Sequence, residues 1–379
     1  MIHMNLAALR DHLDRNVCPS ADTWDREQRV PREALNALGD LGLLGAMVDT
    51  PFGGTACDPL AWGAAIELLG EGSMSLLSLV TVHAMCCHAV QRWGQPEQQR
   101  EWLPQLASGR LFGAFALTEP AIGSDAKNVT TRFEDAGDHW KVNGGKRWIS
   151  GAQIADVYLV IGQGPAGPTA LIVPRRSEGV SVQPIRDMLG FRAAQLGEIV
   201  FSDVLVPKVN TIGREGGGFS HVAGSSLDVG RFCVACGCTG LIRACLRASV
   251  DYARSRQQFG EPLRAHQLIQ AMLADMATGY KASSALWRHA AALRAAADPA
   301  SIGETTTAKY FSSMAAARAA NDAVQIHGAN GCGSDYPVQR YFRDARIGEI
   351  IEGSSQMQQI LIAHEACREF ASRRRPAVA

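Results

Sequence analysis

The spacing of hydrophobic residues divides the chain into three stretches, and the first stretch ends near residue 112. Leucines recur three and four positions apart at Leu6, Leu9 and Leu13, which is the spacing of one helix face. Residues 60–90 are apolar and rich in alanine, as in a pair of buried helices. The N-terminal part of the chain is therefore predicted to be helical.

The second stretch contains short apolar runs rich in β-branched residues. Residues 157–161, 170–173 and 199–201 are such runs, and Gly, Pro and Asp separate them. Asn143-Gly144 lies between two further runs and predicts a hairpin turn. No long helical pattern lies between the runs, so we expect a β domain without the crossover helices of a parallel sheet.

Helical spacing returns at about residue 219. Leu268, Met272 and Met276 lie four apart and predict one buried face of a helix. The order helical, β, helical indicates a mixed α+β fold. The predicted domains are 1–112, 113–218 and 219–379.

Composition and charge narrow the possible functions. The 379 residues include 37 Lys and Arg against 37 Asp and Glu, so the formal net charge is zero. Binding to nucleic acid or to a membrane surface is not expected, because both need an excess of positive charge. The basic cluster at residues 373–375 is predicted to be a solvated tail. No apolar stretch of membrane-spanning length and no secretory signal are visible, and ten cysteines then favour a reducing, cytoplasmic location.

Several common site motifs are missing from the sequence. There is no Gly-x-Gly-x-x-Gly, P-loop, His-Glu-x-x-His or Gly-x-Ser-x-Gly. Cys233, Cys236 and Cys238 could form half of a metal site, but no second Cys or His pair follows at ligand spacing. We therefore expect these thiols to pack in a helix and predict no metal.

Three segments carry candidate chemistry. Residues 115–125 (FALTEPAIGSD) form a predicted loop whose hydroxyls and amides could bind a polar heterocycle or a phosphate. Residues 146–151 (KRWISG) read as a strand end with a Trp and a Ser. In residues 349–356 (EIIEGSSQ), the carboxyl of Glu352 has apolar neighbours, which would raise its pKa and suit a general base. Taken alone, the first segment is also compatible with a turn, the second with an amphipathic strand and the third with a helix cap.

Together and in this order, the three segments resemble the acyl-CoA dehydrogenase flavoprotein family. Residues 252–260 (YARSRQQFG) and 325–331 (QIHGANG) extend the resemblance over nearly the whole chain. It implies an N-terminal helical domain, a middle β-barrel-like domain and a C-terminal four-helix bundle. It also implies non-covalent FAD, shared between the subunits of a homodimer or homotetramer, and an electron acceptor of unknown identity.

The resemblance implies a role for individual residues. Glu352 would take a proton while hydride passes to the flavin. The residues implied to bind FAD are Phe115, Leu117, Thr118, Ser124, Trp148, Ser150, Arg256, Phe259, His266, Gln325, Gly328, Ser354 and Gln356. Those expected to reach the FAD of a neighbouring subunit are Arg256, Phe259, His266, Gln325 and Gly328. Those implied to contact the acyl thioester are Ser124, Asp228, Arg231, Ile351 and Gly353.

Two positions leave alternatives open. Asp228 and Arg231 match a pair beside the pantetheine arm in the family, but they could equally form an i,i+3 ion pair on a helix surface. Residues 81–85 (TVHAM) also resemble a carrier-dependent branch of the family, and the simpler interpretation is a buried helix with one satisfied histidine.

The substrate expectation rests on a departure from the family. Ile351 stands where most members have an aromatic residue, and residues 349–355 look most similar to enzymes that oxidise acyl groups on carrier proteins in polyketide and nonribosomal-peptide pathways. We expect a short acyl group on an acyl carrier protein, such as a hydroxymalonyl unit.

Three other functions are weighed against this one. The first is an ordinary dehydrogenase of short- or medium-chain acyl-CoA. The second is a flavin oxidase or monooxygenase, although such relatives usually lack the glutamate. The third is a relative that binds flavin and nucleic acid, which the zero net charge disfavours.

Overall fold

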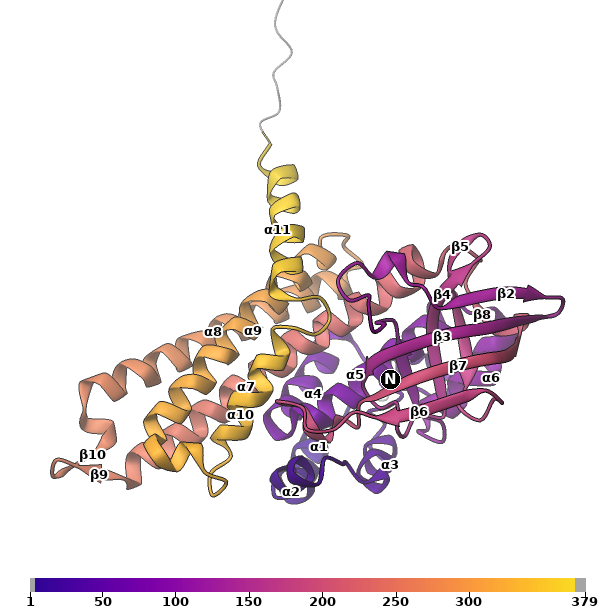
Figure 1. Ribbon diagram of the computed structural model, residues 1–379. Helices are drawn as coiled ribbons and strands as arrows, with labels where there is room; N and C mark the ends of the chain where they lie inside the picture. Colours follow the sequence, from indigo (N-terminus) through magenta and orange to yellow (C-terminus); the bar gives the residue numbers. More distant parts are fainter. Residues whose placement is uncertain (1–3, 372–379) are drawn as a thin grey trace, which may run out of the picture.

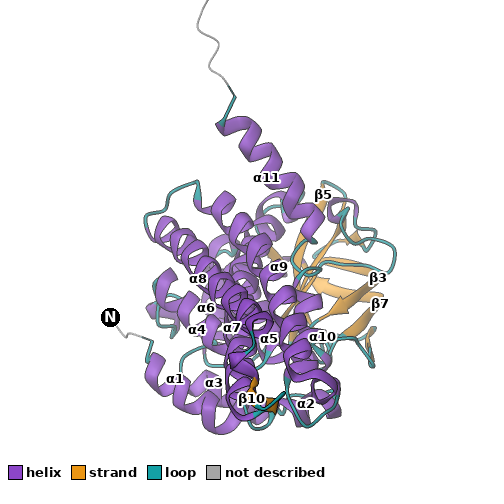
Figure 2. Cartoon of the chain, turned by 90° about the vertical axis from the view of Figure 1, so that its left-hand side faces the viewer, coloured by secondary structure: helices purple, strands orange, loops and turns teal. Residues whose placement is uncertain are grey.

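The computed structural model describes residues 4–371, and its elements follow the predicted order (Figure 1). The basic cluster at 373–375 lies outside the described residues. Helices come first, then a sheet, then a second and longer set of helices. Figure 2 shows the strands gathered on one side of the helices. The predicted α+β class is confirmed.

The N-terminal part is helical, as predicted. Its helices are α1 (Leu6–His12), α2 (Ala21–Glu27), α3 (Arg32–Asp40), α4 (Pro59–Gly72), α5 (Met74–Trp93) and α6 (Pro96–Ala107). Helix α4 begins with a proline in its first turn, and the Asp58 carboxylate accepts hydrogen bonds from the N–H groups of Leu60 and Ala61, each at 3.0 Å. Helix α5 is apolar on nearly every side, so it lies in the core.

The middle part is one mostly antiparallel sheet. Its strands are β1 (Gly113–Ala116), β2 (Arg132–Ala136), β3 (His139–Ile149), β4 (Val157–Gly164), β5 (Gly167–Pro174), β6 (Val180–Pro184), β7 (Gly197–Pro207) and β8 (Thr211–Ile212). The order is β6-β7-β3-β2-β4-β5-β8, and β1 pairs with β4 in parallel. The sheet holds the ends of β1 and β3 next to the helices.

The predicted hairpin turn at Asn143-Gly144 is wrong. Strand β3 continues through both residues, and the chain turns instead at Gly137, whose φ is +77°. Gly144 has φ +136° and lies at a register shift between β3 and β7, where an added Cβ would be 2.8 Å from Thr131 Cα. A β-bulge and a tight turn both favour glycine at positive φ, so the dipeptide alone does not distinguish them.

The C-terminal part is built on three long helices. Its elements are α7 (Gly224–Ser255), α8 (Gln267–Ala295), α9 (Ser301–His327), α10 (Val338–Gly348) and α11 (Ser355–Glu369), with a small hairpin of β9 (Gln257–Gln258) and β10 (Glu261–Pro262). Helix α11 points away from the body of the molecule (Figures 1 and 2). Short 3₁₀ or π segments cover Leu13–Val17, Thr50–Phe52, Ala126–Asn128, Arg192–Ala194, Lys208–Asn210, Gly218–Ala223, Leu263–Ala265 and Gly328–Cys332.

Two helical segments, Met74–Trp93 and Gly218–Ser255, are long and apolar enough to cross a membrane by length and composition alone. Both are mostly buried inside the protein, as core helices are. Their apolar character is therefore explained by packing, and Cys233 and its neighbours on α7 are buried thiols within that core.

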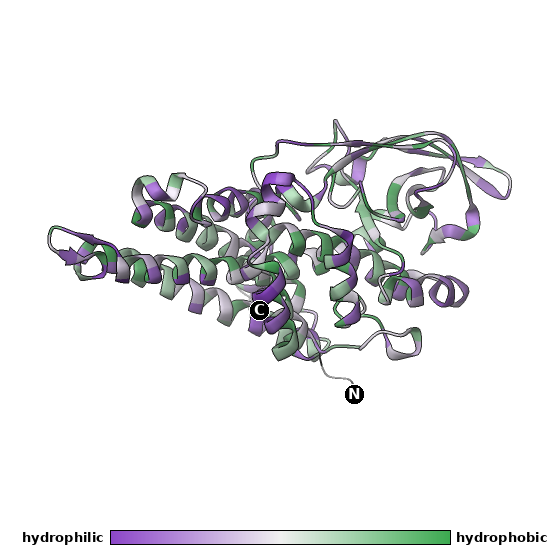
Figure 3. Cartoon of the chain, turned by 90° about the horizontal axis from the view of Figure 1, so that it is seen from below, coloured by the Kyte–Doolittle hydropathy of each residue, from purple (hydrophilic) through white to green (hydrophobic). Residues whose placement is uncertain are grey.

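The predicted buried face of α8 is only partly buried. Met276 lies in the core, but Leu268 is 79% exposed. Other large apolar side chains of the C-terminal part, including Ile302 and Phe370, are also exposed. Figure 3 shows hydrophobic residues along these long helices. The spacing identified the helix correctly, but it does not tell a core from a surface that another chain would cover.

Candidate active site

The loop that carries Glu352 has an unusual backbone. It joins α10 to α11, and Ser354 caps α11 by accepting a hydrogen bond from the N–H of Met357 at 3.4 Å. Glu352 and Gly353 are both left-handed, with φ of +54° and +90°. A residue with a Cβ rarely adopts this conformation, so other contacts must hold the loop.

Side chains from three helices hold the loop through its carbonyl groups. Arg231 on α7 donates from Nε to the carbonyl of Glu352 at 3.2 Å. Lys309 on α9 donates from Nζ to the carbonyl of Gly353 at 2.8 Å. Gln358 on α11 donates to both carbonyls, at 3.1 Å and 2.9 Å. Two successive carbonyl groups are thereby fixed, and the direction of the Glu352 side chain with them.

The Glu352 carboxyl is buried between α5 and α7. Among the described residues, its Oε2 atom has no hydrogen-bond partner. An added Cβ on Gly230 would lie 2.4 Å from this oxygen and 3.0 Å from the sulfur of Met85. Burial raises the pKa of Glu352 to about 7, while the charges of Arg231 and Lys309 act to lower it. A carboxyl that titrates near neutrality can take and return a proton at physiological pH.

The predicted flavin residues of the sheet lie together. Phe115 and Leu117 are buried at the end of β1, and the N–H of Arg147 on β3 donates to the carbonyl of Thr118 at 2.9 Å. Trp148 follows on β3 with φ +62° and remains 46% exposed, with the Arg147 guanidinium 4.8 Å from its ring centre. A tryptophan held in this conformation with an open face suits contact with a flat ring.

Helix α5 relates this group to Glu352. Ser78 donates a hydrogen bond to the Ser150 hydroxyl at 2.9 Å, and Met85 faces the Glu352 carboxyl. Ser78 and Met85 are seven residues apart, so they share one face of the helix and are separated by roughly 10 Å along its axis. The Trp148 end of β3 and the Glu352 loop therefore lie over the same face of α5.

Sequence reasoning missed an ion pair that fixes the loop after β1. Lys146 is completely buried, and its Nζ donates to Glu119 Oε1 at 2.7 Å and to the carbonyl of Leu117 at 3.0 Å. Glu119 also accepts from the N–H groups of Thr130 and Thr131, at 2.7 Å and 2.8 Å. The signal in the sequence was a lysine two positions before Trp148, at an inward-facing position of the strand.

The structure does not bring the residues that were expected to reach the FAD of a neighbouring subunit to Trp148 within one chain. Tyr252 on α7 and His327 on α9 stack with ring centres 4.2 Å apart, which joins the ends of these helices. The β9–β10 hairpin extends from this end, far from β3 in Figure 1, and Phe259 at its tip is 96% exposed. The residues at this end are Arg256, Phe259, His266, Gln325 and Gly328.

Asp228 and Arg231 do not form the alternative i,i+3 ion pair. Asp228 Oδ2 pairs with Arg294 at 2.7 Å, because Arg231 turns toward the Glu352 loop. Among the other predicted substrate residues, Ile351 packs against the core, and Ser124 lies exposed on the loop after β1. Ser354 and Gln356 lie at the start of α11, where the Gln356 side chain is exposed.

For residues 81–85, the structure agrees with the simpler interpretation, a buried helix with one satisfied histidine. His83 is completely buried on α5. Its Nδ1 accepts from the N–H of Gly113 at 3.2 Å, and its Nε2 lies 3.2 Å from the carbonyl of Leu106. It is a satisfied core residue that ties α5 to β1.

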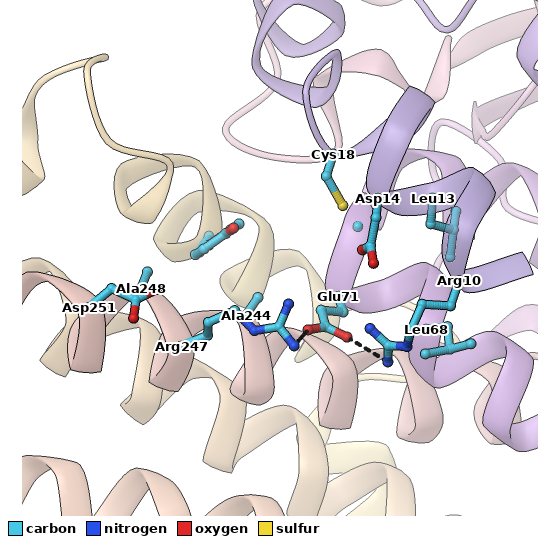
Figure 4. Close-up of a pocket in the computed structure, with 12 residues that line it drawn as sticks. Arg10, Leu13, Asp14, Cys18, Leu68, Glu71, Ala244, Arg247, Ala248 and Asp251 are labelled. Atoms are coloured by element: carbon cyan, nitrogen blue, oxygen red, sulfur yellow. Dashed lines mark hydrogen bonds and ion pairs between the residues drawn. The ribbon is translucent and has the colours of Figure 1, made fainter. Parts of the chain in front are cut away.

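A hollow of about 240 Å³ lies away from these residues, between the N-terminal helices and α7 (Figure 4). Glu71 at its centre is neutralised by Arg10 at 3.4 Å, Arg247 at 3.0 Å and Arg243. None of the predicted site residues lines it. Its central carboxylate is paired with arginines, and the hollow is not the candidate active site.

The residues near Trp148 fit FAD. The indole of Trp148 is 46% exposed and can cover a flat ring, and Ser150, two residues later, is held by its hydrogen bond from Ser78. An added Cβ on Gly123 in the loop after β1 would meet nothing within 4 Å, so the loop backbone is open to a ligand. Bound there, FAD would supply a two-electron acceptor on the face of α5 that also meets Glu352.

Comparison with known proteins agrees with this arrangement. Family models described as the N-terminal, middle and C-terminal domains of acyl-CoA dehydrogenase match residues 3–110, 114–204 and 216–367. An acyl-CoA dehydrogenase of Bacillus subtilis is 36% identical over 362 residues, which cover 94% of this chain and 95% of that protein.

Two solved structures are also similar to this chain. A glutaryl-CoA dehydrogenase from Mycobacterium smegmatis in complex with FADH2 is 28% identical with a TM-score of 0.90, covering 95% of this chain and 92% of that one. FkbI, described as serving biosynthesis of the methoxymalonyl extender unit of the polyketide Fk520, is 32% identical with a TM-score of 0.88, covering 96% and 99%.

Proposed function

The chain belongs to the acyl-CoA dehydrogenase family, FAD-dependent oxidoreductases of acyl thioesters, and we propose that Glu352 is its general base and a short carrier-bound acyl group its substrate. Glu352 takes the proton alpha to the thioester carbonyl, and hydride leaves the substrate for the flavin. In a hydroxymalonyl-type reaction the proton would come instead from an oxygenated carbon's hydroxyl. The same carboxyl serves either reaction.

The buried, unpartnered carboxyl of Glu352 is the observation that carries this proposal. A carboxylate in water is a weak base toward a carbon acid, and burial removes the water that would stabilise its charge. Among the described residues, the N–H of Glu352 donates to no acceptor. It is therefore free to donate to the substrate carbonyl oxygen as negative charge develops there.

Glu352→Gln tests the role of the base. The variant should bind FAD and fold, but the rate of flavin reduction under anaerobic conditions should fall by ~10²–10⁴-fold, the usual contribution of a general base. Glu365→Gln is the matched control, because Glu365 lies on α11 and pairs only with exposed Arg368. Parental flavin reduction by Glu352→Gln would assign the base to another residue.

The carrier-bound substrate is supported by the likeness to FkbI and by Ile351. An aliphatic residue at this position gives the acyl pocket a different wall from that of an aromatic one. The test compares flavin reduction by octanoyl-CoA, butyryl-CoA and small oxygenated acyl groups on a carrier protein. Reduction by the carrier-bound groups is expected, and turnover of the CoA esters alone would contradict the proposal.

Ordinary oxidation of short- or medium-chain acyl-CoA is the second candidate. The 36% identity to the Bacillus subtilis acyl-CoA dehydrogenase favours it. The same comparison of thioesters decides between the two. Oxygen consumption during turnover, without an added acceptor, would instead indicate the flavin oxidase or monooxygenase reaction.

We also propose that FAD is shared between subunits of a homodimer or homotetramer. Phe259 and the hairpin around it make few contacts within one chain, and Leu268 at the start of α8 is exposed as well. A second chain could cover these apolar residues and receive Phe259, Arg256 and His266 at its flavin. Light scattering of the FAD-loaded protein measures the assembly, and a monomer that retains FAD would refute this sharing.

A further inference from the structure

Lys309 on α9 is completely buried, although most buried lysines have an acidic partner. In the described part of the chain, no carboxylate lies within ion-pair distance of its ammonium group. Its hydrogen bond goes to a neutral group, the carbonyl of Gly353, at 2.8 Å. Burying an ammonium group in this way costs folding free energy, so we expect Lys309 to serve the site.

The groups around Lys309 and Glu352 leave an excess of positive charge. Those whose charges act on either residue are Arg231, Cys233 and Cys238 from α7 and Glu349 from the loop. Burial raises the pKa of both thiols to about 12, so they are neutral at pH 7. Glu349 is neutralised by Arg346 at 2.6 Å. Two cations, Arg231 and Lys309, therefore face the single carboxyl of Glu352.

We propose that Lys309 is a positioning residue for the base, holding the Gly353 carbonyl by its hydrogen bond and favouring ionised Glu352 by its charge. This inference rests on the proposed role of Glu352. Arg231 and Gln358 share the first task, because they donate to the same pair of carbonyl groups. Only Lys309 and Arg231 can share the second, since Gln358 is uncharged.

The two tasks explain why a lysine is buried here. Desolvation alone would leave Glu352 protonated and unable to take a proton, and a nearby cation offsets part of that effect. Burial lowers the pKa of Lys309 to about 8, so the ammonium group still carries its charge at neutral pH. The Glu352 carboxyl then remains desolvated, while a useful fraction of it is in the ionised form.

Infrared titration of the FAD-loaded protein without substrate tests the inference. The Glu352 carboxyl band is identified as the one lost in Glu352→Gln, and its titration midpoint is measured in the parent and in Lys309→Met. We expect a midpoint near 7 in the parent and a midpoint on the order of one pH unit higher in the variant. Gln358→Met is the matched control, because it removes hydrogen bonds to the loop but no charge, and its midpoint should stay near the parent's.

Flavin reduction separates this inference from the proposed function. The pH profile of the reduction rate in Lys309→Met should shift upward with the infrared midpoint, with the loss of rate partly recovered at high pH. An unchanged midpoint and profile in Lys309→Met would overturn the role of Lys309 while leaving Glu352 as the base. Parental activity in Glu352→Gln would instead overturn the proposed function. If Lys309→Met does not fold, Lys309→Gln, which keeps a donor for Gly353, is measured in its place against the same expectations.

Discussion

Replacing Glu352 by glutamine should stabilise the protein at alkaline pH while removing its activity. The folded protein holds the carboxyl proton with a pKa of about 7, against an ordinary value of 4.5. Because the folded pKa is raised, this group's contribution to stability is fully present below pH 4.5 and is lost as the pH rises through 7. Glutamine resembles the protonated form and does not ionise, so the variant escapes this loss.

The difference between the two pKa values sets the magnitude. A change from 4.5 to about 7 corresponds to up to about 3 kcal/mol of unfolding free energy. The gain of Glu352→Gln over the parent should therefore be near zero at about pH 4 and approach this value at about pH 8. Functional sites often carry such a cost, because the arrangement that favours catalysis is not the most stable one.

Urea unfolding of the two FAD-loaded proteins at both pH values measures the effect. The useful quantity is the difference between variant and parent, since the titration of groups distant from Glu352 contributes equally to both. Glu365→Gln, at an exposed position, should show no dependence of this difference on pH. An equal difference for Glu352→Gln at the two pH values would mean that its carboxyl is solvated, and the argument for a desolvated base would fail.

Three further substitutions test the remaining parts of the site. Lys146→Met leaves the buried carboxylate of Glu119 without its partner, so unfolding free energy should fall by about 3–5 kcal/mol with loss of FAD, whereas Lys141→Met in a surface pair should change little. Gly230→Ala places a methyl group against the base, so flavin reduction should fall in stopped-flow measurements while the FAD content is kept. Phe259→Ala should lower both the FAD content and the native mass in light scattering, if the exposed ring contacts a second subunit.

The order of the domains could be read from the sequence because helical and β spacing differ over long stretches. Single turns could not be predicted in the same way. The glycine of the dipeptide at residues 143–144 lies in a β-bulge and not in a hairpin turn. The exposure of Leu268 also could not be predicted from the sequence, because an apolar helix face has the same residue pattern whether its own chain or another chain covers it. Local sequence patterns predict backbone conformation and polarity. Which other residues cover a given surface depends on the tertiary structure.

Glu352 could be singled out because its segment, a carboxyl among apolar neighbours and a glycine, occurs together with the other segments that resemble the family; alone, it fits a helix cap as well. The residues that hold the Glu352 loop could not be singled out from the sequence. Arg231, Lys309 and Gln358 come from three helices that meet only in the folded chain. Arg231 was noticed for a different role, and Lys309 looked like any other lysine in an alanine-rich helix. The proposed base is recognised by its own segment and the accompanying family motifs, but its readiness to act depends on long-range contacts. This is why substitutions at Lys309 are more informative about the site than further changes within the loop.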